Sequence, residues 1–116
     1  MSWVHDYYHA VDTMNMDAYL AFHTDDVRLR FGNNPVSEGK PAVAEGLGHL
    51  WDSLQSLKHD FTAVWEVDNV GIAEANITYV RKDGHTVVLP CVTVLRRTGN
   101  LVNDVQINMD IAPLFG

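Results

Sequence analysis

The sequence contains very little cysteine, with only Cys91 among 116 residues. A single thiol cannot form an internal disulfide, and there is no cysteine pair of the kind that holds a structural zinc. The segment 1–10, "MSWVHDYYHA", lacks the basic and apolar parts of a signal peptide. No apolar run approaches the length of a membrane-spanning helix. We therefore expect a reduced, cytoplasmic protein.

Basic residues are also scarce. Eight Lys and Arg stand against 15 Asp and Glu, which gives a formal net charge of -7. A surface of this charge repels phosphate backbones and anionic lipids, and the one basic cluster, Arg96-Arg97, is too small to overcome that repulsion. We expect no nucleic-acid partner and no membrane partner.

What the sequence does contain is enough apolar material for one core. Apolar residues make up 47% of the chain and charged residues 20%, which argues against disorder. The length fits a single domain over 1–116.

The first half of the chain predicts helices around one short strand. Apolar residues at helical spacing predict a helix over 2–13, and Asn15 can cap a second, short helix that ends near 24–26. "VRLRF" at 27–31 alternates like a strand. After the break at 32–35, "GNNP", a helix over 41–55 is predicted, with a proline at its first position.

From residue 58 the pattern changes to a period of two. Strands are predicted near 58–68, 72–81, 85–96 and 101–110, and Asp83-Gly84 is a strong hairpin signal. We expect an α+β fold in which helices lie on one face of a curved antiparallel sheet. A sheet that curls around helices leaves a cone with an open mouth, which is a natural pocket for a small molecule.

The order of these elements resembles the nuclear transport factor 2-like superfamily. The resemblance rests on residues 7–43, "YYHAVDTMNMDAYLAFHTDDVRLRFGNNPVSEGKPAV", on 81–100, "RKDGHTVVLPCVTVLRRTGN", and on 107–115, "INMDIAPLF". This superfamily includes SnoaL-like polyketide cyclases, ketosteroid isomerase, scytalone dehydratase and limonene-epoxide hydrolase. It implies a cone-shaped, cystatin-like fold, a homodimer, and chemistry without a cofactor on a small apolar or aromatic molecule.

The catalytic residues of the isomerase are not retained. Resemblance places its tyrosine at Tyr7 or Tyr8, and the sequence leaves both possible. Its carboxylate base falls on Phe31 and its second aspartate on Val92, so steroid isomerisation is not expected.

Of the catalytic residues of the epoxide hydrolase, only one has a counterpart in this sequence. Its asparagine matches Asn33, which could point into the pocket from the turn. Its charged triad falls on Ala75, Ile77 and Ile107, all apolar here, so that hydrolytic mechanism is not expected either.

Scytalone dehydratase provides a third comparison. It has an aspartate late in the first helix, which matches Asp12, and it uses histidines from the sheet. Only His59 and His85 lie on predicted strands, and the resemblance does not decide between them. Asp12 lies one helical turn after Tyr8, so both occupy the same flank of the first helix.

The candidate catalytic residues are therefore Tyr8, Asp12, Asn33 and His59, with no metal site and no cofactor. The predicted pocket lining consists of Phe31, Trp51, Trp65, Ala75, Ile77, Val92 and Ile107. Each candidate has a structural alternative: Asp12 can be a solvated residue at the helix end, His59 an exposed residue at a strand end, and the aromatic residues ordinary core.

Three functions remain open. The domain can be an enzyme for a small apolar substrate, a ligand-binding domain that has lost the catalytic residues of its relatives, or a dimerisation module whose cavity is incidental.

Overall fold

The computed structural model describes residues 2–115. Within these residues, four helices and six strands follow one another: α1 (Trp3–Asp12), α2 (Met16–Leu20), β1 (His23–Phe31), β2 (Ser37–Glu38), α3 (Lys40–Asp52), β3 (Leu54–Val67), β4 (Val70–Arg81), β5 (Thr86–Thr98), β6 (Leu101–Asn108) and α4 (Ala112–Phe115). This confirms the expected α+β class.

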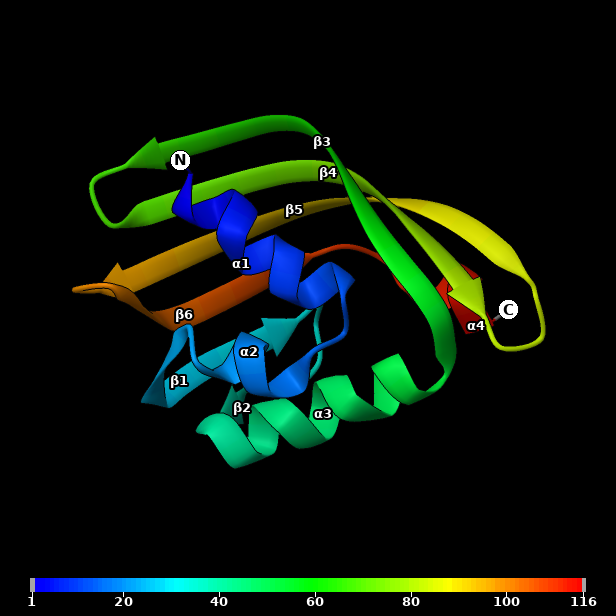
Figure 1. The fold of residues 1–116 in the computed structure, drawn as a ribbon, viewed down its shortest axis with the longest axis horizontal. Helices are drawn as coiled ribbons and strands as arrows, with labels where there is room; N and C mark the ends of the chain where they lie inside the picture. Colours follow the sequence, from blue (N-terminus) through cyan, green and yellow to red (C-terminus); the bar gives the residue numbers. More distant parts are fainter. Residues whose placement is uncertain (1, 116) are drawn as a thin grey trace.

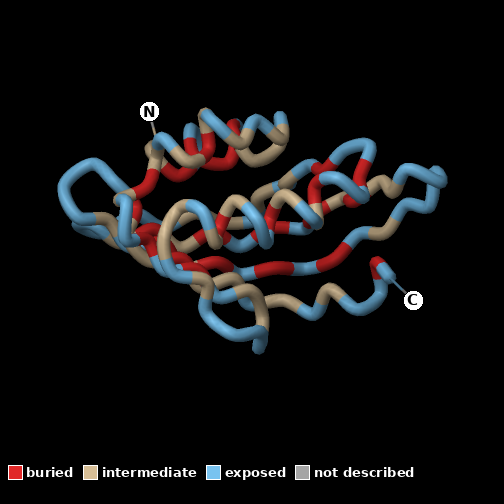
Figure 2. Tube along the Cα trace, turned by 90° about the horizontal axis from the view of Figure 1, so that it is seen from below, coloured by how far each residue is buried: buried red, intermediate tan, exposed pale blue. Residues whose placement is uncertain are grey.

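The strands form one curved sheet in the order β2-β1-β6-β5-β4-β3. The long strands β3 to β6 make the predicted antiparallel meander. β1, however, pairs with β6 in parallel, so the sheet is mixed. In Figure 1, α1 and α2 lie in front of the sheet and α3 runs along its lower edge, and Figure 2 shows these helices on one side of it.

Local sequence signals explain how the first helices begin. The side chain of Ser2 caps α1 by accepting a hydrogen bond from His5 N, and Asn15 caps α2 by accepting one from Ala18 N. The cap at Asn15 confirms the sequence prediction. The strand β1 begins four residues earlier than predicted, at His23, because α2 ends already at Leu20.

The break at 32–35 is a turn that requires its glycine. Gly32 has a φ of +58°, and a Cβ there would lie 3.2 Å from Met109 O. Gly32 N donates to Ile107 O at 2.8 Å, and Asn34 N closes the turn on Phe31 O at 3.0 Å. The side chain of Asn33 is exposed here and does not point into the core, contrary to expectation.

An irregularity in β3 reverses the predicted direction of the side chain of Trp65. The register with β4 shifts between Phe61 and Ala63, and one extra residue reverses which side chains point inward. Before this bulge His59 and Phe61 lie on the helix-covered face. Beyond the bulge, Trp65 is 51% exposed on the opposite face of the sheet. It therefore belongs neither to the core nor to the pocket lining that the sequence predicted.

Candidate functional site

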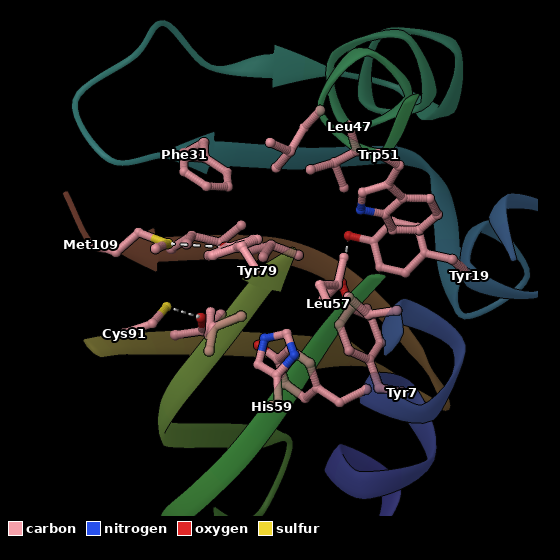
Figure 3. Close-up of a pocket in the computed structure, with 17 residues that line it drawn as sticks. Tyr7, Tyr19, Phe31, Leu47, Trp51, Leu57, His59, Tyr79, Cys91 and Met109 are labelled. Carbon is pink, nitrogen blue, oxygen red and sulfur yellow. Dashed lines mark hydrogen bonds between the residues drawn. The ribbon is translucent and has the colours of Figure 1, made fainter. Parts of the chain in front are cut away.

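A small cavity lies between the helices and the inner face of the sheet. Its volume is about 50 Å³, and its walls come from α1, α2, α3 and all of the long strands. Figure 3 shows Tyr7, Tyr19 and Trp51 on one side of it, with His59 between them and the sulfur-bearing side chains of Cys91 and Met109. Most of the lining is apolar, so polar groups that face it are few.

Asp12 and His59 form a pair at this cavity. Asp12 Oδ1 accepts a hydrogen bond from His59 Nδ1 at 2.6 Å, and Asp12 Oδ2 accepts one from the backbone N–H of His59 at 2.9 Å. An ionised carboxylate can only accept, so Nδ1 carries a proton, and in the neutral form of the ring Nε2 keeps a free lone pair. The His59 side chain is 8% exposed and lines the cavity.

Helix stability does not explain why an aspartate occupies position 12. Asp12 is the last residue of α1, where a negative charge opposes the helix dipole by about 0.3–1 kcal/mol. The two hydrogen bonds to His59 offset that cost. The pair therefore fixes the orientation and the tautomer of the imidazole ring, as a carboxylate does for catalytic histidines.

Tyr8 packs against the same histidine. The two ring centroids are 4.5 Å apart, and Tyr8 lines the cavity. Burial raises the pKa of the Tyr8 hydroxyl well above its ordinary value, while a hydrogen bond with Thr93 opposes the shift. Tyr8 thus stays protonated at neutral pH and can act as a hydrogen-bond donor.

The sequence left open whether Tyr7 or Tyr8 faces the pocket. In the structure both are buried and both line the cavity. Tyr7 is 1% exposed, and its hydroxyl lies 2.8 Å from Tyr19 Oη and 2.9 Å from His23 Nε2. Burial, followed by the effect of neighbouring tyrosines, raises the pKa of Tyr7. Burial also raises the pKa of Tyr19.

His23 is a polar core residue that the sequence did not point to. It is 1% exposed, and burial lowers its pKa to about 4 even though the carbonyls of Tyr19 and Leu20 favour the charged ring. His23 shares the inward parity of Val27 and Leu29, which was the available signal. Charged Asp25 interrupts that pattern, and the sequence predicts the end of a helix near 24–26 and a strand that begins at Val27.

Four of the predicted lining residues do face the cavity: Phe31, Trp51, Ile77 and Ile107. Ala75 is buried on the same face of the sheet but does not line the cavity. Val92 is 37% exposed on the other face, because its neighbours Cys91 and Thr93 are the inward residues of β5. Val92 therefore does not line the cavity, contrary to the prediction.

Cys91 and Thr93 are lining residues that the sequence comparison missed. Cys91 Sγ lies 3.4 Å from Thr93 Oγ1, and burial raises the pKa of the thiol. The alternation of β5 could have identified both, since Leu89 and Leu95 share their parity.

Over residues 2–115, no set of three or more His, Cys, Asp and Glu side chains is arranged to hold a metal ion. None of the helices in the same range is long and apolar enough to cross a membrane.

Solved structures share this fold along almost the whole chain. An NTF2-like protein of unknown function from Burkholderia pseudomallei superimposes with a TM-score of 0.86 at 17% identity, covering 99% of this chain and 96% of that one. A protein proposed to be a polyketide cyclase, from Xanthomonas campestris, gives 0.87 at 24% identity, with 97% and 90% covered.

A third structure contains a bound small molecule. It is a protein with a ketosteroid isomerase-like fold from Catenulispora acidiphila, in complex with trimethylamine, with a TM-score of 0.81 at 15% identity and 91% and 83% covered. At these identities the likeness establishes the fold alone.

Sequence comparison establishes the family. No protein with a curated description matches this chain. The SnoaL-like domain family matches residues 4–105, which is most of the sequence. The chain therefore belongs to the SnoaL-like domain family, with the NTF2-like fold that the resemblance implied.

Proposed function

We propose that this domain is a cofactor-free enzyme that moves a proton on a small, mostly apolar substrate. The observation that carries the proposal is the Asp12–His59 pair, in which the carboxylate orients an imidazole inside an apolar cavity. A general base can start isomerisation, dehydration or cyclisation by removing a proton from a carbon next to a carbonyl group.

His59 Nε2 is the proposed base. It makes no hydrogen bond to the residues that the structure describes, so its lone pair is available to a substrate proton. When Nε2 takes that proton, the ring becomes positively charged and Asp12 stabilises it. The same nitrogen then returns the proton to another atom of the substrate, or to a departing hydroxyl group.

Tyr8 is the proposed donor to the substrate oxygen. Proton removal next to a carbonyl places negative charge on that oxygen, and a buried hydroxyl donor stabilises the charge more strongly than water does. Tyr8 is buried beside His59, and its raised pKa keeps the proton on the hydroxyl. Asn33 has no part in this mechanism, since it is exposed and lines no cavity.

Deuterium exchange tests this proposal without knowledge of the natural substrate. The protein is incubated in D2O with 2-tetralone, a neutral two-ring ketone with acidic protons, and exchange is followed by proton NMR. General base catalysis contributes about 100-fold or more, so His59→Gln should lower the catalysed exchange by at least that factor. The matched control is His85→Gln, because His85 is exposed on the hairpin.

Catalysed exchange that survives His59→Gln would contradict the role of His59. If the native protein binds 2-tetralone without exchange, the second candidate function is favoured: a binding domain for small apolar molecules. That candidate is supported by the apolar Ile77 and Ile107 in the lining, where a related hydrolase is expected to have charged residues.

A homodimer is also part of the proposal. The sheet face opposite the helices exposes large apolar side chains, among them Trp65, Val88 and Val92 at 51%, 56% and 37%. Apolar side chains grouped on one uncovered sheet face are typical of an interface. Sedimentation velocity should give a dimer mass for the native chain and a monomer mass for Val92→Arg, whereas a native monomer at high concentration would refute it.

A further inference from the structure

The inner cavity is too small to hold a substrate by itself. Its volume is about 50 Å³, whereas pockets for small organic ligands usually measure roughly 300–1,000 Å³. It has room for the few atoms of a reacting group and no more. Any substrate that reaches His59 must therefore place most of its body elsewhere.

A second hollow lies directly beside the first. It is a groove of about 390 Å³ between β1, the turn that follows it, α3 and the C-terminal segment. Phe31, Leu47 and Leu50 line both hollows, so the two hollows adjoin at these three side chains. In Figure 3, Phe31 and Leu47 lie across the cavity from His59.

The chemistry of the groove defines what it can bind. Its floor is apolar, with side chains such as Leu29, Val43 and Ile111, and its polar side chains are those of Asn34, Ser37, Ser53 and His49. Among the described residues that line it, none is Lys, Arg, Asp or Glu. A charged ligand would therefore lack a counter-charge, and a neutral apolar body is favoured.

Gly46 keeps this groove open. It lies within α3, where glycine is less favourable than alanine, and neither a positive φ nor a close contact requires it: a Cβ there would meet only Ser37 Oγ, at 3.9 Å. Gly46 does line the groove, so any larger side chain would project into it. Gly48 on the same helix lines neither hollow and has open space around its Cα; nothing in the structure explains it.

We propose that the groove is a binding site for the neutral, apolar body of the substrate, of about two to three rings. The polar end of the same molecule passes Phe31, Leu47 and Leu50 to reach His59. The part of this inference that places the polar end at His59 rests on the proposed function. Binding of the body depends on the groove alone and can be measured without turnover.

The test uses N-phenyl-1-naphthylamine, an uncharged fluorescent molecule of suitable size, titrated into the full chain. Gly46→Leu should weaken its binding at least 10-fold, because the leucine side chain occupies the groove. Gly48→Leu is the matched control, with the same change on the same helix, and should leave the Kd within twofold. Thermal unfolding of both variants establishes that each is folded.

Failure of this inference is distinguishable from failure of the proposed enzyme function. If Gly46→Leu binds the fluorophore as tightly as Gly48→Leu does, or if the native chain does not bind it, the groove is not the site. If Gly46→Leu loses binding but the native chain does not exchange the protons of 2-tetralone, the groove is confirmed as a binding site and the proposed enzyme function is contradicted.

Discussion

The carboxylate of Asp12 joins the end of α1 to the middle of β3 by accepting two hydrogen bonds from one residue, His59. The side-chain nitrogen Nδ1 lies 2.6 Å from one carboxylate oxygen and the backbone nitrogen 2.9 Å from the other. One residue thereby positions the imidazole ring and also ties the first helix to the sheet. The contact therefore bears both on stability and on the role proposed for His59.

Replacing Asp12 with alanine should lower the free energy of unfolding by about 1–2 kcal/mol. Two partly buried donors on His59 lose their acceptor, and relief of the unfavourable charge at the helix end offsets part of that loss. Urea denaturation measures the change. In the matched control, Asp60→Ala removes only an exposed pair with Lys58 and should change stability by less than about 1 kcal/mol. Equal losses would contradict the structural role of Asp12.

Acid should destabilise the protein through His23. Its pKa is about 4 in the folded chain, below the value of 6.5 expected when it is exposed. Above pH 6.5 both states are neutral at this residue and it contributes no pH dependence. Between pH 6.5 and 4 the unfolded chain takes up the proton and the folded chain does not, so stability falls, by up to roughly 3 kcal/mol.

The variant His23→Gln isolates this effect. Glutamine can still form a hydrogen bond with Tyr7 but does not titrate. Urea midpoints measured from pH 7 to pH 4 should therefore fall less steeply for His23→Gln than for the native chain. Parallel curves would show that His23 is not the source of the acid sensitivity.

The two predicted pocket tryptophans should differ in their access to solvent. Trp51 is 7% exposed beside the cavity, while Trp65 is 51% exposed on the uncovered face of the sheet. In iodide quenching of tryptophan fluorescence, Trp65→Phe should remove most of the quenchable emission and Trp51→Phe should remove little. The reverse result would mean that the bulge in β3 does not turn Trp65 outward, or that another subunit covers it.

Alanine should have opposite effects at two glycines. Gly48→Ala fills open space on a helix and should raise stability by about 0.5–1 kcal/mol. Gly71→Ala should lower it, because the new Cβ would lie 2.6 Å from Val4 Cγ2 and 2.8 Å from the Trp3 ring. The midpoints of thermal unfolding check both signs. A Gly71→Ala variant as stable as the native chain would mean that the side chains of Val4 and Trp3 shift aside at no cost.

The catalytic candidates Asp12 and His59 were each identified from the sequence, but their pairing was not. They are separated by 47 positions, and no local pattern relates the end of a helix to a strand so far along the chain. The same limit applies to Val92. Its strand was predicted, whereas its inward or outward direction depends on register against neighbouring strands, which a shift of one residue reverses.

By itself the sequence determined the order of the three longer helical segments and the five longer strands, the cap at Asn15 and the turn at Gly32, because periodicity and backbone preference act over a few residues; β2 and α4 were not predicted. Family resemblance extended this to the cone-shaped fold. Only the tertiary structure decided that β1 lies parallel to β6, that a bulge turns Trp65 away from the core, and that His23 is buried. These features arise from contacts between distant segments, where packing and hydrogen bonding of the whole sheet outweigh the preference of any single stretch.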